Sequence, residues 1–212
     1  MSTKNTQTIL IERDGKSELL TIAEWEALSK TSFSTILTFD TPSLRPKIAK
    51  KTEKLYRKGE LSRQQLWFGN YFKTEMNSLF IPDVMIRYID PVFGWGVFAN
   101  RDFRKMEFIA EYSGLLRKAR SRDKTNAYCF EYTLANGVKT SYTIDAQDQG
   151  GIGRLVNHST SPNLQSSLAT VDFVSHIILI TNQKIPKGTQ LCYDYGPDYW
   201  SQRESPKQLI IN

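Results

Sequence analysis

The most informative segment of the chain reads Arg154-Leu155-Val156-Asn157-His158-Ser159-Thr160-Ser161-Pro162-Asn163, here called the Asn-His segment. It follows a glycine-rich stretch and precedes a long run of strand-forming residues. Taken alone, such a polar loop has an ordinary explanation, because Asn, Ser and Thr side chains readily bond to their own backbone in turns. The segment becomes informative when it is considered together with three other segments of the chain.

Three other segments stand out. The glycine segment, Gly94-Trp95-Gly96-Val97, predicts a tight turn whose backbone can closely approach a ligand. Tyrosines lie near glycines in the Glu-Tyr segment, residues 111–114, and in the tyrosine segment, residues 185–195. Each also has an ordinary explanation, as a common turn or as a core aromatic with a solvated hydroxyl.

The order and spacing of the four segments resemble the SET domain of protein-lysine methyltransferases, over about residues 84 to 200. The matching patterns are Gly94-Trp95-Gly96-Val97, Glu111-Tyr112-x-Gly114, Arg154-x-x-Asn157-His158-Ser159-x-x-Pro162-Asn163 and Ile185-Pro-x-Gly188-x-x-Leu191-x-Tyr193-Asp194-Tyr195. The resemblance implies a mainly β fold of small sheets. It also implies a threaded, pseudoknot-like crossing of the third and fourth segments, which patterning alone never suggests.

The resemblance also implies S-adenosylmethionine as the cofactor and assigns roles to residues. The implied catalytic residues are Tyr195 and Tyr112. The implied cofactor-binding residues are Gly94, Trp95, Gly96, Tyr128, Arg154, Asn157, His158, Tyr195 and Trp200. The implied lysine channel, which sets how many methyl groups are added, comprises Tyr193, Tyr112 and Tyr128.

A site of tyrosines suits this chemistry. A free lysine has a pKa of about 10.4 and is protonated at neutral pH. An aromatic channel removes water from the ammonium and a nearby sulfonium repels it, so both favour the neutral amine. A strong general base is then unnecessary. In the family, tyrosine two residues before the catalytic tyrosine limits methylation, so Tyr193 predicts chiefly mono-methylation.

Two departures from many family members agree with each other. Thr160 replaces a zinc-ligating cysteine, and no cysteine follows Cys192, so we expect no metal. Tyr199 and Trp200 are then candidates to close the cofactor site, although a tail that merely docks on the core is the alternative. Because it has no cysteine-rich, zinc-binding flanks, the chain resembles the compact SET proteins of viruses and of intracellular bacteria such as chlamydiae.

The sequence pattern changes near residue 80. Before it, Asp14-Gly15 predicts a hairpin, Thr21 with Glu24 and Ser62 with Gln65 predict two capping boxes, and helices are expected around them. After it, the pattern favours short strands at 84–89, 96–99, 107–112, 127–134, 140–144, 171–181 and 190–193. We therefore expect a mostly helical N-terminal extension (1–80), a SET domain (81–200) and a C-terminal tail (201–212).

Basic residues outnumber acidic ones by 28 to 22 and concentrate in two places. Residues 45–63 contain eight Lys or Arg against Glu53 and Glu60, and a second cluster spans residues 117–124. Either is typical of a nucleic-acid contact or, equally, of a solvated helix face. Together with the resemblance, this favours histones or histone-like DNA-associated proteins as substrates, although a ribosomal protein stays open.

Two other function classes remain open: an inactive SET-fold binding module, and a protein that mainly binds nucleic acid through residues 45–63. Whether residues 1–80 form a homodimer or bind the target is also open. No signal peptide or membrane-length apolar run occurs, and two strand-embedded cysteines fit a reducing compartment. We expect a cytoplasmic or nuclear location. If the source is an intracellular bacterium, we expect export to the host nucleus without a cleavable signal.

Overall fold

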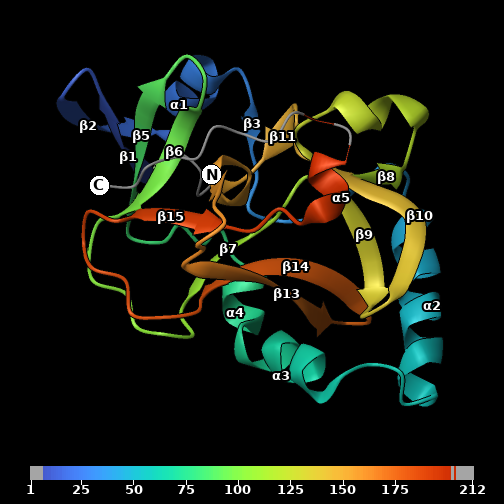
Figure 1. The fold of residues 1–212 in the computed structure, drawn as a ribbon. Helices are drawn as coiled ribbons and strands as arrows, with labels where there is room; N and C mark the ends of the chain where they lie inside the picture. Colours follow the sequence, from blue (N-terminus) through green and yellow to red (C-terminus); the bar gives the residue numbers. More distant parts are fainter. Residues whose placement is uncertain (1–6, 202, 204–212) are drawn as a thin grey trace.

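The computed structural model describes residues 7–201 and 203, and within them the chain forms several small sheets with helices at their edges (Figure 1). The strands are β1 (Thr8–Arg13), β2 (Lys16–Thr21), β3 (Ser32–Phe33), β4 (Thr38–Phe39), β5 (Val84–Asp90), β6 (Gly94–Ala99), β7 (Phe108–Glu111), β8 (Leu115–Lys118), β9 (Cys129–Ala135), β10 (Val138–Asp145), β11 (Gln149–Gly150), β12 (Asn157–His158), β13 (Leu164–Val171), β14 (Val174–Thr181) and β15 (Gln190–Tyr193). The helices are α1 (Ile22–Ser29), α2 (Leu44–Arg57), α3 (Arg63–Tyr71), α4 (Lys73–Met76) and α5 (Pro197–Trp200).

Four sheets form from these described strands. Their strand orders are β12-β15-β6-β5-β1-β2, β4-β8-β10-β9, β13-β14-β7 and β11-β3. The helices lie mostly in the first 80 residues, as the sequence predicts, with α2 at the side and α3 below in Figure 1. No helix of the described residues is long and apolar enough to cross a membrane.

The N-terminal hairpin forms as predicted. β1 pairs with β2 in register from Thr8↔Thr21 to Arg13↔Lys16, and both Asp14 and Gly15 adopt positive φ in the turn. Thr21 and Glu24 exchange both bonds of the predicted capping box at the start of α1. β1 also pairs in parallel with β5, so residues before and after position 80 share one sheet and one core. The change of pattern at residue 80 is therefore not a boundary in packing.

The second predicted capping box is only half formed, which corrects that expectation. Ser62 accepts a hydrogen bond from the Gln65 backbone, but the Gln65 side chain does not return to Ser62. Its amide instead donates to the Leu134 carbonyl and lies within hydrogen-bonding distance of two buried hydroxyls, Thr170 and Ser175. Burial against β13 and β14 outweighs the local bond.

Most predicted strands form, but the expected strand at 171–181 is wrong at its start. A two-residue turn at Asp172 and Phe173 joins β13 to β14, and both residues have positive φ. Such turns usually contain glycine or asparagine, so the sequence offers no turn signal here. β8 and β13 were not expected either, since β13 includes the polar pair Ser166-Ser167.

The two basic clusters differ. All eight basic side chains of residues 45–63 are exposed, while Leu44, Ile48 and Thr52 hold α2 on the core. In the second cluster, Arg117 is buried and pairs with two carboxylates, as described below. Residues 117–124 are thus not a uniformly free basic surface, because Asp123 within the cluster and the distant Asp145 neutralise Arg117.

Candidate functional site

The Asn-His segment and the tyrosine segment lie side by side. β12 and β15 pair in parallel, with Asn157 opposite Cys192 and His158 opposite Tyr193. Buried Asn163 fixes this pairing, because its amide donates to the Gln190 carbonyl at 2.8 Å and accepts from the Cys192 backbone at 2.9 Å. The Asn-His segment and the tyrosine segment are thereby held in register, which accounts for Asn163 at the end of the motif.

Tyr195 is anchored at both ends. Its hydroxyl donates to the Val156 carbonyl at 2.8 Å, and its backbone N–H donates to Nδ1 of His158 at 3.2 Å. His158 accepts this bond through an unprotonated Nδ1. Burial lowers the pKa of His158, against an opposing effect of Asp194, whose carboxylate lies 3.6 Å away. The neutral imidazole is therefore the form that fits the site.

Aromatic rings surround Tyr195. Tyr193 and Tyr199 lie with ring centroids 4.7 Å from it, and Trp200 stacks parallel to it at 6.1 Å. The ring centroid of Trp200 also lies 4.8 Å from that of His158. The structure thus places α5 directly over the Asn-His segment, where Tyr199 and Trp200 were candidates to close the site.

Tyr112 forms the opposite side of the aromatic cluster. It is buried, contacts Phe130 at 5.0 Å between ring centroids, and donates its hydroxyl to the Tyr128 carbonyl at 3.0 Å. Phe130 stacks in turn against Tyr193. Burial raises the pKa of Tyr112, Tyr193 and Tyr195 above that of a free phenol, so all three are neutral hydroxyls at physiological pH.

The glycine segment contributes mainly backbone. The Asn157 amide donates to the Trp95 carbonyl at 3.4 Å, while the Trp95 ring packs between Trp25 and Tyr88. A Cβ on Gly96 would lie 2.7 Å from Ile89, 2.9 Å from the Gln190 amide and 3.2 Å from the Asn157 amide. A side chain at position 96 would therefore displace the ends of these three side chains, including the Asn157 amide.

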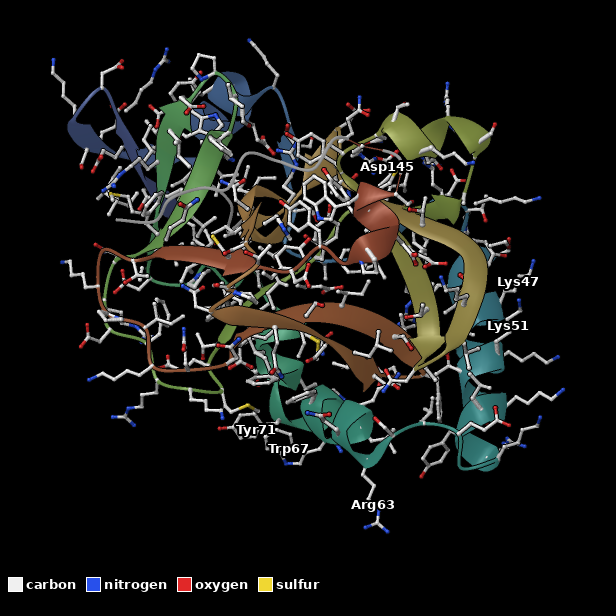
Figure 2. The ribbon with its side chains drawn as sticks, viewed as in Figure 1. Lys47, Lys51, Arg63, Trp67, Tyr71 and Asp145 are labelled. Carbon is white, nitrogen blue, oxygen red and sulfur yellow. The ribbon has the colours of Figure 1, made fainter. Side chains whose placement is uncertain are left out.

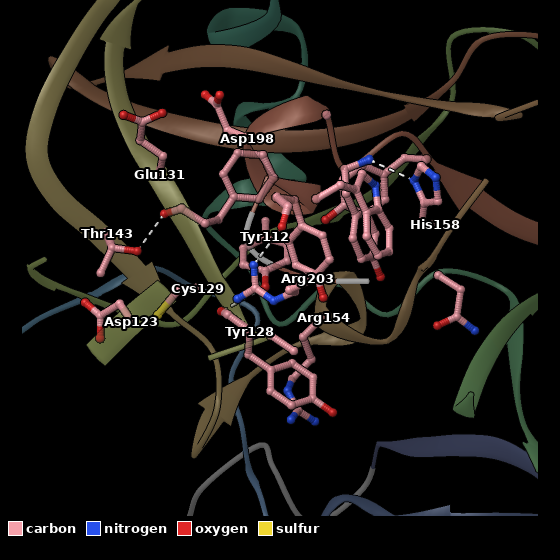
Figure 3. Close-up of a pocket in the computed structure, with 18 of the residues that line it drawn as sticks. Tyr112, Asp123, Tyr128, Cys129, Glu131, Thr143, Arg154, His158, Asp198 and Arg203 are labelled. Carbon is pink, nitrogen blue, oxygen red and sulfur yellow. Dashed lines mark hydrogen bonds between the residues drawn. The ribbon is translucent and has the colours of Figure 1, made fainter. Parts of the chain in front are cut away.

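Arg154 lies with its guanidinium 4.1 Å above the ring of exposed Tyr128 and donates to the Ala146 carbonyl at 2.6 Å. Figure 3 shows the pair at one side of the pocket. The arginine thus orients a tyrosine at the cavity edge, an interaction that the sequence could not indicate.

These groups line one cavity of about 1790 Å³ (Figure 3). That exceeds the roughly 300–1,000 Å³ of a typical small-molecule pocket, leaving room for more than one ligand. The lining includes every residue assigned from the sequence except Gly96, which lies behind it: Gly94, Trp95, Tyr112, Tyr128, Arg154, Asn157, His158, Tyr193, Tyr195 and Trp200. Residues 7–201 and 203 contain no group of three His, Cys, Asp or Glu arranged to hold a metal.

Some lining residues escaped sequence reasoning. Arg203 donates to the carbonyls of Tyr199 and Asn126, and lies 4.1 Å from the Tyr199 ring. Lys139 contacts Asp198 and Glu131, both at 3.1 Å. These bonds join α5 to the β9–β10 hairpin and hold it over the cavity. No motif marks them, because each partner comes from a separate part of the chain.

Comparison with known proteins agrees with this geometry. A family model described as the SET domain matches residues 94–196. The chain is 40% identical over 112 residues to the N-lysine methyltransferase KMT5A of Xenopus tropicalis, covering 49% of this chain and 33% of that protein. It is 38% identical over 112 residues to the histone-lysine N-methyltransferase Set8 of Drosophila melanogaster, covering 49% of this chain and 16% of that protein.

Among solved structures, SUVH6 of Arabidopsis thaliana in complex with SAM is 31% identical, with a TM-score of 0.47, over 55% of this chain and 29% of that one. The chain thus spans a third or less of the length of the two curated relatives. The mainly β fold expected from the resemblance is confirmed.

Proposed function

We propose that this chain, which contains a SET domain over residues 94–196, transfers a methyl group from S-adenosylmethionine to a lysine side chain of another protein. The single observation that supports this best is the position of the Tyr195 hydroxyl. It is fixed on the Val156 carbonyl, within a cluster of neutral tyrosines at the cavity. Such a cluster suits the alignment of an amine, and the curated relatives above are named as lysine methyltransferases.

The cavity fits the cofactor. The indole N–H of Trp200 is buried without a hydrogen-bond partner among the described residues, and Trp200 lines the cavity. A buried donor without a partner costs free energy, so a ligand acceptor there is favourable. Gly94, Trp95, Asn157, His158 and Arg154 would hold the remainder of the ligand through backbone and amide groups. S-adenosylmethionine, when bound, supplies a methyl group on a positively charged sulfur.

The residues of the chain then prepare the amine. Tyr112, Tyr193 and Phe130 exclude water from a lysine side chain, and desolvation favours its neutral form. The tyrosine hydroxyls of 112 and 195 each donate their proton to a main-chain carbonyl, so their oxygen lone pairs are available to the amine. This fixes the nucleophile in line without a phenolate base. Orientation of this kind supplies much of the rate enhancement in such displacements.

Mono-methylation is the product that we propose. Tyr193 is 4% exposed and its ring contacts both Tyr195 and Phe130, so its hydroxyl occupies space beside the proposed amine position. A methylated amine needs that space. A phenylalanine in its place would leave room for a second methyl group.

The proposed substrates are histones or histone-like proteins bound to nucleic acid. The relative from Drosophila is named as a histone-lysine methyltransferase, and the exposed basic residues of 45–63 are complementary to nucleic acid. We propose that the enzyme acts in the nucleus or the cytoplasm. For an enzyme of the compact bacterial or viral type, the proposed location is the nucleus of the host.

Transfer of labelled methyl groups to purified proteins tests the proposal. The panel contains core histones, nucleosomes, a bacterial histone-like protein, a ribosomal protein and an acidic control protein, and cofactor binding is measured by calorimetry. Label in a basic protein supports methyltransferase activity. Cofactor binding without label in any protein favours the inactive binding module, and the absence of both contradicts the proposal.

A further inference from the structure

The outer face of α2 carries an ordered row of positive charge. Lys47, Lys51, Lys54 and Lys58 follow one another three or four residues apart, so they lie on one side of the helix, over about 16 Å. All are exposed, and only Lys58 has an acidic partner among the described residues, Glu60 at 3.5 Å. Because Leu44, Ile48 and Thr52 are buried on an adjacent side of α2, the core fixes the direction of this row.

The next helix, α3, carries a second ordered row. Arg63, Trp67 and Tyr71 are spaced four residues apart and lie along its outer side (Figure 2). Trp67 is 48% and Tyr71 61% exposed, and their rings stack 4.7 Å apart at 16°. Phe68 and Phe72 already supply the buried face of the helix region, so the core does not need these two aromatic rings.

The basic row begins at the cavity edge. The ammonium groups of Lys47 and Lys51 each lie 6.0 Å from the ring centroid of Tyr142, which itself lines the cavity. From there the row follows α2 to its end at Arg57, and residues 58–62 lead to Arg63. We call these residues the α2–α3 surface: its lysines lie on the side of the molecule formed by α2, and its aromatic pair lies on the adjoining lower side formed by α3 (Figure 2).

We infer that the α2–α3 surface binds single-stranded nucleic acid, with phosphates on the α2 lysines and unpaired bases on Trp67 and Tyr71. A positive row beside exposed aromatic rings is the arrangement that single strands require, because bases stack on rings while the backbone follows the charge. A duplex hides its base faces and would leave the rings unused. A membrane would need an apolar helix face to insert, and those of α2 and α3 are buried in the core.

Fluorescence anisotropy with a labelled oligothymidine tests the inference, and binding does not depend on methyl transfer. We expect the logarithm of the binding constant to fall linearly with the logarithm of salt concentration. In a variant with Lys47→Gln, Lys51→Gln and Lys54→Gln, the slope should decrease by about 2, since each phosphate contact of a single strand contributes about 0.7. The matched control, Lys105→Gln, Lys184→Gln and Lys187→Gln, removes the same charge from exposed loops across the molecule and should retain the slope.

The aromatic half has its own test. Trp67→Ala with Tyr71→Ala should weaken oligothymidine binding roughly tenfold or more. Leu19→Ala, on an equally exposed apolar residue of β2, should not weaken it. Thermal unfolding of each variant verifies the fold.

The inference would be overturned if the wild-type protein did not bind the oligonucleotide, or if both triple-lysine variants lost the same amount of affinity. It would also be overturned if the protein bound a duplex of equal charge more tightly than the single strand, with an affinity that Trp67→Ala did not change. Binding to anionic vesicles in preference to the oligonucleotide would contradict it as well. Its use in catalysis rests on the proposed function. Binding without methyl transfer would leave this inference intact and remove only the proposed activity.

Discussion

The hydroxyl of Tyr195 and the carbonyl of Val156 are joined by a hydrogen bond of 2.8 Å, which links two segments 39 residues apart at the centre of the cavity. The bond sets the direction of the phenol and leaves the lone pairs of its oxygen free to accept a hydrogen bond.

Tyr195→Phe removes the hydroxyl and keeps the ring contacts with Tyr193, Tyr199 and Trp200. We expect methyl transfer to fall by about a hundredfold, the order of loss caused by misplacing reacting groups. Cofactor affinity and the unfolding midpoint should change little. Single-turnover transfer of labelled methyl is the measurement, and a variant with wild-type rates would show that the hydroxyl is not needed.

Tyr193→Phe tests product specificity. Removing this buried hydroxyl enlarges the space beside the amine, so di- and tri-methylated products should accumulate where wild type gives mono-methyl lysine. Mass spectrometry of a modified substrate distinguishes these products. Abundant trimethyl-lysine from the wild-type enzyme would contradict the role that we assign to Tyr193.

His158 predicts a pH dependence. Burial lowers its pKa below the free value of about 6.5, so on acidification the unfolded chain takes up a proton before the folded one. This part of the stability should therefore be complete above about pH 6.5 and decline below it, whereas cofactor binding should decline only at the lower pH where the folded His158 takes up its proton. Protonation of Nδ1 also breaks the bond from the Tyr195 backbone.

An NMR titration of the His158 ring and cofactor affinity as a function of pH measure the effect. Asp194→Asn serves as the matched variant. Because Asp194 raises the pKa of His158, its removal should move the titration to lower pH. An upward movement would mean that the carboxylate does not act on this ring.

Gly69→Ala should destabilise the fold, although glycine to alanine usually stabilises a helix by about 1 kcal/mol. A Cβ at Gly69 would lie 1.8 Å from the Thr170 carbonyl oxygen, where α3 packs directly on β13. We expect a loss of about 3 kcal/mol in urea unfolding, the upper part of the range for overpacking. Asn70→Ala, one residue along on the exposed side, should be neutral or stabilising.

Arg117→Ala should cost about 3 kcal/mol of unfolding free energy, as expected when one partner of a buried ion pair is removed. The arginine is 4% exposed and lies 2.7 Å from carboxylate oxygens of both Asp123 and Asp145. Lys118→Ala, on an exposed neighbour, should change little.

The same ion pair should depend on pH. Arg117 holds the pKa of Asp123 below its usual value, so this part of the stability is present above about pH 4 and declines as the pH falls further. The difference between wild type and Arg117→Ala in urea unfolding should therefore shrink in acid. A difference independent of pH would show that packing alone causes the loss.

Local signals in the sequence were sufficient for several elements. Asp14-Gly15 predicted a hairpin that forms, and Thr21 with Glu24 predicted a capping box whose two bonds are present. These devices act between residues at most a few positions apart. Ser62 and Gln65 show the limit of such reasoning, because Gln65 exchanges a local bond for three buried partners more than 60 residues away.

The sequence likewise predicted some features of the site and not others. The residue types and their spacing, from Gly94 to Tyr195, indicated the domain and the side chains that meet in the cavity. They could not indicate which partner each would choose. The contact of Arg154 with Tyr128, the bonds of Arg203 over Tyr199, and the burial of Arg117 all depend on chain segments brought together by folding.

By itself, the sequence determined the mainly β pattern, the helices of the first 80 residues, the segments that form the cavity and the positive charge of α2. These features can be predicted because hydrophobic periodicity and turn-forming residues act between near neighbours in the chain. The spacing of residues within a motif can likewise be read without knowing the fold. Only the tertiary structure decided that β12 pairs with β15, that α5 covers the cavity, and that Trp67 and Tyr71 lie on the lower side of the molecule, next to the side that carries Lys47. Those arrangements depend on contacts between distant residues, whose free energies are set by burial and geometry rather than by neighbours in the chain.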